Sequence, residues 1–459
     1  MATKIKSVNL FLPLAMVVAT WLVWLAWPTH YFFLNDDFIH IPLAAQNFIG
    51  HRNSIRFVGD LSLALDSLVF GKNATGFHLT NLLLHLANIA LVFAVTTRLI
   101  GARNTHHTML TPWATAILFG VFAFHSDGIF WVIGRSASLG MLFSLLTWLT
   151  LMKVRDKPWL GIISLFWWIA ALFSYEASWI MPVVVTVWMV QQKRHTSTTL
   201  TIINIWIAFG IYLYYRKQTT GEWLGSYEAW AFADLDIGTL AANYLKLLCR
   251  TWLPPLPVKW HFTVLAANAG VLHCLAAYHI LAGKHINKTW SLLTVCWLAS
   301  YLPYLSLGIG ISGYESERYL YYPSFFWSAW AVYTILLLYL RQAVIQQIIL
   351  LALIGYHSIF LYYAASAWQA ASSLSKQTFH LISSLPESKA LCFENLPGTV
   401  QGIPLFRIGL EEGVAWLAQP YSKKDIQINS RQDFSTVKLR ISKQQKDTCY
   451  IISYAPLKP

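Results

Sequence analysis

Charged side chains are scarce in this sequence of 459 residues. Asp, Glu, Lys and Arg make up only 12% of the chain, whereas 56% of the residues are hydrophobic and 15% are aromatic. Such a composition cannot cover a soluble globule with an ordinary polar surface. Apolar segments that approach the roughly 20 residues needed to cross a bilayer recur from residue 8 to residue 366. The sequence therefore predicts a polytopic, all-α membrane protein.

The sequence also lacks the patterns of several other classes of protein. Its five cysteines have neither metal-ligand nor redox-dithiol spacing, which argues against zinc and against thiol chemistry. The formal net charge is +13, but the basic residues are scattered over short loops and a polar tail. Because they form no single patch, nucleic acid is not an expected partner. We interpret the basic residues mainly as a topology signal.

About eleven membrane crossings are predicted from the hydrophobic runs. Basic residues gather in the short loops between alternate runs, which places the N-terminus in the cytoplasm by the positive-inside rule. Residues 240–254 are apolar but short and carry Lys246 and Arg250, so we expect them to lie at the interface, as we do for amphipathic pieces within residues 40–72. The predicted crossings lie at residues 8–33, 77–98, 112–124, 136–152, 159–174, 177–191, 199–215, 261–283, 289–307, 319–340 and 343–366.

A small α+β domain is predicted after the last crossing. Residues 1–366 would form the membrane domain and residues 367–459 an extracytoplasmic domain, because the composition becomes polar beyond residue 366. Cys392 and Cys449 both fall in predicted strands, where they are candidates either for a disulfide or for two buried reduced thiols. A helical stretch is expected at 371–385, strands at 390–395, 425–430, 435–442 and 448–454, and a further helix at 409–418.

Acidic residues lie almost entirely on one side of the predicted topology. Thirteen Asp and Glu precede residue 370, and all except Asp156 fall on the extracytoplasmic side, beginning with Asp36 and Asp37. One carboxylate held at the membrane surface can take a proton from a hydroxyl nucleophile, while its neighbour positions it or binds a divalent cation. A solvated loop pair or a helix N-cap is the simpler interpretation of the same dipeptide.

A polar stripe runs along the second predicted helix. Its residues are separated by three, four and three positions, which places them on one helical face that should point into the protein or a water-filled cavity. Hydrogen bonding between helices is the favoured explanation for the two inner members. The outermost member is the better candidate for a functional contact. The stripe consists of His78, Asn81, His85 and Asn88.

Two external segments combine carboxylates with arginines. The turn at residues 124–135 contains His125, Asp127 and Arg135, and the planar fork of an arginine is suited to a phosphate. A structural Arg–Asp pair explains these residues equally well, and Glu176 could also partner such an arginine.

The second segment, at residues 313–324, contains Glu315, Glu317, Arg318 and Tyr321 among several tyrosines. An interfacial aromatic belt with one local ion pair is again an equal alternative. The aspartate pair, the polar stripe and the two segments at 124–135 and 313–324 could all line one cavity. Their combination indicates a functional site more specifically than any one of them does.

Taken in order, these segments resemble a known family. The resemblance is carried by DD at 36–37, FHLTNLLLHLANI at 77–89, WVIGR at 131–135, YEASWIMP at 175–182 and SERYLYYPS at 316–324. They are similar to the membrane half of the transmembrane and tetratricopeptide-repeat O-mannosyltransferases and their bacterial relatives. These enzymes are GT-C glycosyltransferases that use polyprenyl-phosphate sugars.

The resemblance implies a GT-C-like transferase of the bacterial inner membrane with a periplasmic active site. It implies that Asp36 or Asp37 is the catalytic base and that Arg135 and Arg318 lie near the lipid phosphate. The chain departs from the family at the turn, which usually reads His-Pro with a second His and a Glu, and where Asp127 replaces the Glu. It also lacks the 34-residue helical period of the repeats, so a protein acceptor delivered by repeats is not supported.

The expected reaction is an inverting displacement at the anomeric carbon of a polyprenyl-phosphate sugar. The aspartate base would deprotonate an acceptor hydroxyl of a glycolipid, polysaccharide or protein, and the arginines would neutralise the leaving phosphate. A divalent metal at Asp36 and Asp37 is a candidate cofactor, although no ligand spacing demands it. The further roles expected are orientation of the arginines by Asp127, Glu176 and Glu317, and contacts to sugar or phosphate by His78, His125 and Tyr321.

Two other functions remain open at this point. A transporter or flippase of lipid-linked sugars would be expected to show two repeated halves with interrupted helices, and no such repeat is visible. A polymerase or ligase of surface polysaccharide shares the lipid-phosphate leaving group and is not distinguished from a single-sugar transferase by the sequence.

Overall fold

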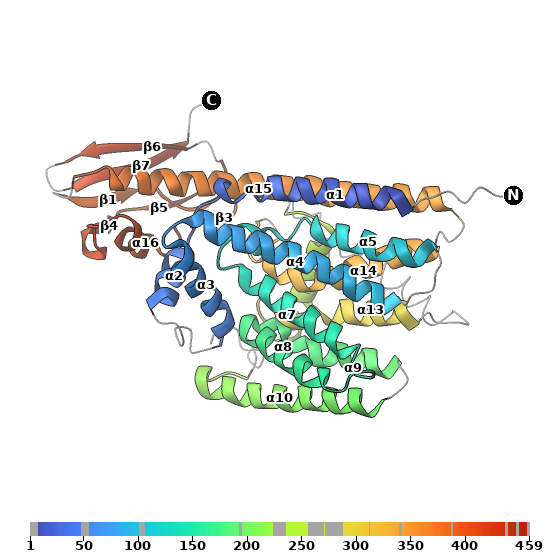
Figure 1. The fold of residues 1–459 in the computed structure, drawn as a ribbon. Helices are drawn as coiled ribbons and strands as arrows, with labels where there is room; N and C mark the ends of the chain where they lie inside the picture. The colour runs from blue at the N-terminus through green and yellow to red at the C-terminus, as the bar shows by residue number, and fades with distance from the viewer. Residues whose placement is uncertain are drawn as a thin grey trace.

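The structure is mostly helical, with a small strand-containing domain at one end of a long helical bundle (Figure 1). The first helix, α1 (Val8–Leu25), begins at the opposite end of the bundle from the strands (Figure 1). It is a computed structural model, and it describes residues 8–46, 55–100, 106–191, 195–223, 236–255, 270, 288–311, 313–338, 342–386, 389–436, 439–446 and 449–456.

The helices of the bundle follow most of the hydrophobic runs closely. Their order is α1 (Val8–Leu25), α4 (Ala74–Ile100), α5 (His106–Gly120), α7 (Arg135–Leu151), α8 (Leu160–Ser174), α9 (Met181–Gln191), α10 (Thr196–Thr220), α13 (Lys288–Ala299), α14 (Tyr321–Leu338) and α15 (Ala343–Ser383). The run predicted at 289–307 ends early as an α-helix, at Ala299, because Pro303 has no backbone N–H to donate to the carbonyl of that residue. The run predicted at 261–283 lies outside the described residues.

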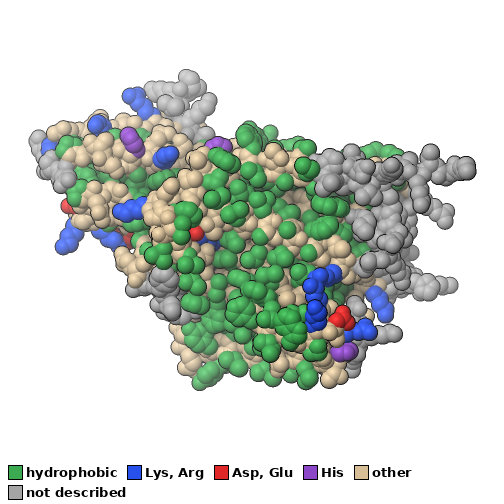
Figure 2. Space-filling model, in the orientation of Figure 1, with side chains coloured by type: hydrophobic (Ala, Val, Ile, Leu, Met, Phe, Trp, Pro, Cys, Tyr) green, Lys and Arg blue, Asp and Glu red, His purple; other side chains and the backbone are tan. Residues whose placement is uncertain are grey.

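Three of the described helices are long and apolar enough to cross a membrane, namely α4, α10 and α15. Four shorter apolar helices occur at Leu14–His30, Leu110–Gly120, Leu160–Ser174 and Glu176–Gln191. The prediction of eleven crossings is therefore not confirmed, whereas the apolar character is. Hydrophobic side chains cover the middle of the visible face and Lys and Arg gather toward its two ends (Figure 2). Ile162, Ile207 and Ile211 are among the apolar side chains that are more than half exposed.

The helix α15 is continuous over 41 residues. A crossing at 343–366 and a separate helix at 371–385 were expected, but no proline or glycine lies between the two segments, and they form one rod about 60 Å long. The predicted boundary at residues 366 and 367 falls within this rod. Gln369 of α15 donates to the carbonyl of Leu25 (3.3 Å) and Ser375 to that of Phe33 (2.8 Å), so α15 is tied to the segment that follows α1.

Two short helices, α2 (Asp37–Gln46) and α3 (Phe57–Phe70), lie between the bundle and the strand domain (Figure 1). Helices are thus present within residues 40–72, where amphipathic pieces were predicted, and their position at the membrane surface stays a prediction. The exposed face of α3 carries apolar side chains such as Leu68 and Val69, whereas its Asp60 and Asp66 are buried. The segment predicted as an interfacial helix at 240–254 is also helical, as α11 (Ile237–Trp252), and its Arg250 is buried.

The C-terminal domain contains two small sheets and the helix α16 (Leu410–Leu417). The four predicted strands and the predicted helix are confirmed. The first sheet has the order β4 (Ile426–Ile428), β1 (Ala390–Glu394), β7 (Cys449–Pro456) and β6 (Leu439–Gln445), with only β6 and β7 antiparallel. The second sheet, missed by sequence reasoning, has the order β3 (Ile403–Pro404), β2 (Leu396–Val400) and β5 (Arg431–Phe434).

Cys392 and Cys449 lie on the neighbouring strands β1 and β7. Both thiols are buried in one apolar cluster with Ile451, and no disulfide joins them in the structure. Of the two states left open by the sequence, this structure has the reduced one.

Candidate functional site

The adjacent aspartates Asp36 and Asp37 differ sharply in their surroundings. Asp37 begins α2 and is fully buried, and its two carboxylate oxygens accept the backbone N–H groups of Leu34 (3.0 Å) and Ile133 (3.1 Å). Asp36 is only partly buried, and its carboxylate accepts from the side-chain amide of Asn35. Asp37 therefore ties the loop after α1 to the turn before α7, whereas Asp36 stands at the partly exposed edge of that loop.

Burial also changes the acidity of Asp37. It raises the pKa of Asp37 to about 8, against the lowering effect of the N–H groups of Leu34 and Ile133. A carboxyl that keeps its proton at neutral pH cannot take one from a hydroxyl. Of the two residues predicted as base, Asp36 has the exposure that the role requires.

The short helix α6 (Ser126–Phe130) places a carboxylate against the predicted phosphate ligand Arg318. The guanidinium of Arg318 bonds Asp127 at 3.2 Å, and its carbon lies 5.2 Å from the ring centres of Trp131 and Tyr319. The Arg318 side chain is 22% exposed although Asp127 is buried. The Arg318 guanidinium is therefore held against two aromatic rings while part of the side chain stays exposed to solvent.

The turn that carries Asp127 also touches the aspartate loop. Trp131, on whose ring Arg318 lies, donates its indole N–H to the carbonyl of Leu34 at 3.4 Å. Ile133, two residues further on, donates to Asp37. The aspartate loop and Arg318, about 280 residues apart in the sequence, therefore both contact this one turn.

Glu317, the residue before Arg318, belongs to a separate buried pair. Its carboxylate bonds Arg250 of α11 at 2.6 Å and Ser126 at 2.5 Å, and Trp368 of α15 donates to the same serine at 3.0 Å. Burial raises the pKa of Glu317 to about 7, against the lowering effect of Arg250. Glu317 was expected to help orient Arg135 and Arg318, but its partner in the structure is Arg250.

The second predicted phosphate ligand, Arg135, is enclosed at the start of α7. It has no exposed surface, and its guanidinium bonds Asp66 of α3 (2.5 Å), the side-chain oxygen of Asn81 (2.9 Å) and the carbonyl of Phe77 (2.8 Å). Each side of the planar group has a protein acceptor, so Arg135 joins α3, α4 and α7. Asp66 was not singled out in the sequence as its partner.

Glu176 also has a partner that sequence reasoning missed. Both of its carboxylate oxygens accept from Arg56, at 2.5 and 2.8 Å, and the guanidinium lies 5.4 Å from the ring centre of Tyr175. The expectation that Glu176 orients an arginine is therefore met in kind, but the arginine comes from the loop before α3. Its only sequence signal is a basic residue within the mixed segment at 40–72.

The polar stripe of α4 is entirely buried. His85 bonds the Tyr321 hydroxyl (2.8 Å) and the Gly120 carbonyl (3.0 Å), and Asn88 donates to the Ser138 carbonyl (2.9 Å). The favoured interpretation of His85 and Asn88 as hydrogen bonds between helices agrees with these contacts. Tyr321 takes part in the same network, because Asn88 also donates to its hydroxyl at 3.2 Å.

The other two predicted sugar or phosphate contacts are also enclosed. His125 bonds the Ser324 hydroxyl at 2.6 Å, and its ring lies 4.3 Å from that of Tyr321. His78 is 2% exposed and packs 5.5 Å from the ring of Tyr31. Neither imidazole has the exposed surface that Arg318 has.

The C-terminal domain is docked directly on the aspartate loop. Asn35 donates its backbone N–H to the Leu405 carbonyl (2.8 Å), and its side-chain oxygen accepts from the N–H of Ile408 (3.0 Å). Gly409 has φ +82°, and a Cβ there would lie 2.5 Å from the Asn35 carbonyl oxygen, so the contact requires glycine. On the other side, Arg407 pairs with Glu315 through two bonds of 3.1 Å. The segment at 403–409 thus bridges the loops that carry Asp36 and Arg318.

A divalent metal at Asp36 and Asp37 stays a prediction. Each oxygen of the buried Asp37 already accepts one backbone N–H group. Within the described residues, no group of three or more His, Cys, Asp and Glu side chains is arranged to hold a metal ion.

No protein-family model matches the chain, and no curated protein matches it significantly.

Proposed function

We propose that this chain is a membrane glycosyltransferase that moves a sugar from a polyprenyl-phosphate donor to an acceptor of the cell envelope. The observation that carries the proposal is the meeting of the Asp36 loop and Arg318 on the turn at residues 127–133. A proton acceptor and a cation that are both partly exposed are the two groups that an inverting transfer needs.

In the proposed reaction, Asp36 takes the proton of an acceptor hydroxyl as its oxygen attacks the anomeric carbon. The bond between that carbon and the phosphate oxygen breaks, and the lipid phosphate leaves with the bonding electron pair. Arg318 stabilises the developing negative charge, because its guanidinium can offer two parallel N–H groups to the phosphate. Asp127 holds Arg318 in place through the 3.2 Å contact.

The remaining predicted site residues take supporting roles in this proposal. Arg135 and Glu317 hold helices together through their buried ion pairs with Asp66 and Arg250. His78, His125 and Tyr321 belong to the packed interior, so they shape the site without meeting the sugar. We propose that the N-terminus lies in the cytoplasm. The C-terminal domain, and the aspartate loop on which it is docked, would then lie in the periplasm.

The experiment compares envelope glycolipids and glycoproteins by mass spectrometry in a deletion strain that carries wild-type or variant protein. Asp36→Asn should remove the same sugar from the same glycan as the deletion does, with normal protein levels in the membrane. The matched control is Asp156→Asn, an exposed aspartate at the other end of the bundle, which should leave the glycan unchanged.

Full glycosylation in the Asp36→Asn strain would overturn the assignment of the base. If the deletion instead accumulates a complete glycan on its lipid carrier, while Asp36→Asn behaves as wild type, the protein is a transporter. Loss of a whole polymer, and not of one sugar, would indicate a polymerase or ligase.

A further inference from the structure

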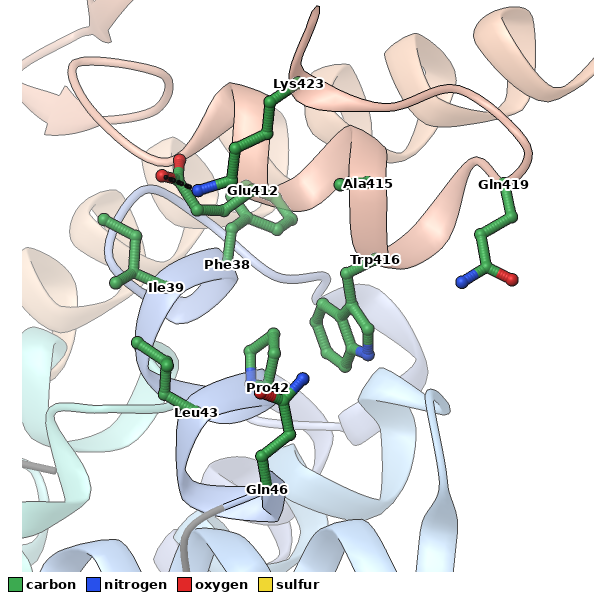
Figure 3. Close-up of a pocket in the computed structure, with 10 residues that line it drawn as sticks. All are labelled: Phe38, Ile39, Pro42, Leu43, Gln46, Glu412, Ala415, Trp416, Gln419 and Lys423. Carbon is green, nitrogen blue, oxygen red and sulfur yellow. Dashed lines mark hydrogen bonds and ion pairs between the residues drawn. The ribbon is translucent and has the colours of Figure 1, made fainter. Parts of the chain in front are cut away.

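A groove separates the helix that follows Asp36 from the C-terminal domain (Figure 3). Its volume is about 360 Å³, within the range of about 300–1,000 Å³ that is usual for small-molecule sites. One wall is α2, which contributes Phe38, Pro42 and Gln46, and the other is α16 and the turn after it, with Trp416 and Gln419. None of these residues takes part in the proposed transfer step.

The groove combines an apolar body with polar ends. The indole of Trp416 projects from α16 toward Pro42 of α2, and the side-chain amides of Gln46 and Gln419 flank it (Figure 3). Gln46 and Gln419 are exposed, and Trp416 is partly exposed. An amide offers both donors and an acceptor, so these ends match hydroxyl groups, while the indole and the proline ring match a face of C–H bonds.

The charges on the groove cancel. Its two charged residues, Glu412 and Lys423, form an ion pair at 2.8 Å and so leave no net charge for a ligand to neutralise. A phosphate or another anion is therefore not the expected occupant. A sugar ring has C–H bonds on its faces and hydroxyls around its rim, and it carries no charge in a neutral glycan.

We propose that this groove binds a neutral glycan, and that the glycan is the acceptor of the transfer. The second half of the proposal rests on the proposed function. Asp36 immediately precedes α2, whose ten residues span roughly 15 Å, so a glycan lying along α2 approaches the loop that carries the base. Trp416 and Gln46 are then specificity-determining residues of the acceptor site.

The position of the groove favours a glycan over a lipid chain. It lies at the end of the molecule that carries the strands, beyond the apolar middle of the bundle (Figures 1 and 2). A polyprenyl chain is expected on the apolar belt, where α4 and α10 expose leucines and isoleucines.

The test measures binding of neutral di- to tetrasaccharides to the full chain by saturation-transfer NMR and calorimetry. The detergent must have no sugar head group, because such a head group would compete for the groove. Trp416→Ala and Gln46→Leu should each weaken binding by about tenfold, which corresponds to about 1.4 kcal/mol. Trp416→Phe should retain most of the affinity, because it keeps an aromatic face. The ring of Trp416 packs against that of Phe33, with the ring centres 5.1 Å apart. Because Trp416→Phe keeps a ring at this position, it also controls for the loss of that packing in Trp416→Ala.

The matched control is Trp159→Ala, since Trp159 is 60% exposed but lies at the start of α8, away from the groove. Its affinity should equal that of the wild type. Failure of the wild-type chain to bind any of these sugars would overturn the proposal. Unchanged sugar binding in both Trp416→Ala and Gln46→Leu would also overturn it. The same holds if these variants lose affinity for polyprenyl phosphate or a peptide and keep their affinity for sugars.

The two proposals can fail separately. If Asp36→Asn abolishes transfer but Trp416→Ala changes neither sugar affinity nor transfer, the groove is not the acceptor site and the transferase stands. If the groove variants lose sugar binding while Asp36→Asn retains full transfer, the groove binds glycan and the proposed base is wrong.

Discussion

Arg135 and Arg318 both lie in sequence segments that combine an arginine with carboxylates, but they have opposite surroundings in the fold. Arg135 has no exposed surface and bonds a carboxylate, an amide oxygen and a backbone carbonyl. Arg318 has one carboxylate, two aromatic faces and 22% of its side chain exposed. The surroundings of Arg135 form a buried polar network between helices, which we call the closed joint. The surroundings of Arg318 are partly exposed to solvent and form the open region.

This difference shows that a motif arginine alone does not identify a ligand contact. A guanidinium whose donors are all taken holds structure together, because another partner would have to displace an existing one. A guanidinium that is held on one side and open on the other can bind a phosphate without rearrangement. The same distinction separates Asp37 from Asp36.

The largest effect is expected where the closed joint is broken. Arg135→Ala leaves Asp66 buried without its partner and should destabilise the folded protein by about 3–5 kcal/mol. Thermal unfolding of the detergent-solubilised protein, followed by size-exclusion chromatography, measures this loss. If Arg135→Ala remains as stable as the wild type but loses transfer, Arg135 contacts the phosphate after all, and the contrast with Arg318 disappears.

The next effect concerns the open region and should appear in activity. Arg318→Ala also leaves a buried carboxyl, Asp127, without its partner. Because burial raises the pKa of Asp127 to about 6, this carboxyl can take up a proton, so the loss of stability should be smaller than in Arg135→Ala. Transfer should fall about 10²- to 10³-fold, as it does when one donor to a developing charge is removed. Arg318→Lys, which keeps the charge but not the two-pronged geometry, should recover part of the rate. A variant Arg318→Ala with a normal rate would refute the assignment.

A third prediction compares the two aspartates through pH. Asp37 has a pKa near 8 when folded and about 3.9 when unfolded, so between these values the folded state binds the extra proton. Its contribution to stability is therefore fully present below about pH 4 and is lost as the pH rises through about 8. Asp37→Asn should flatten the decline of the unfolding free energy over this range.

Part of the decline in unfolding free energy should remain in Asp37→Asn, because burial also raises the pKa of Asp127 to about 6 and that of Glu317 to about 7. Asp156→Asn, which removes an exposed carboxyl outside this region, is the control for the loss of one carboxyl. Equal slopes in Asp37→Asn and the wild type would show that Asp37 is ionised in the fold and restore it as a candidate base.

The smallest effect is expected at the exposed ion pair between Arg407 and Glu315. Both side chains are nearly half exposed, so Arg407→Ala should cost about 0–1 kcal/mol in the unfolding experiment. A larger loss would mean that the C-terminal domain depends on this contact to stay on the two loops. The double variant with Glu315→Gln separates the pair from the single residues.

Local sequence patterns were sufficient to predict most of the helices and four of the strands. Hydropathy located most helices of the bundle, and alternation located β1, β4, β6 and β7, because burial of one face imposes a short period on the sequence. The strand β2 was missed because its Pro397 and Gly398 are poor strand formers, and pairing with β3 and β5 keeps it extended. The continuity of α15 was missed because a change in composition was interpreted as a change in structure.

The sequence by itself determined the apolar class of the protein, the polar stripe on α4 and the position of the aspartate pair directly after the first helix. Only the tertiary structure decided which charged groups meet: Arg135 with Asp66, Arg56 with Glu176, and Arg250 with Glu317. Hydropathy and helical period are local properties, so a sequence window records them. An ion pair between distant segments, and the exposure that separates Asp36 from Asp37, depend on which helix surfaces are packed together.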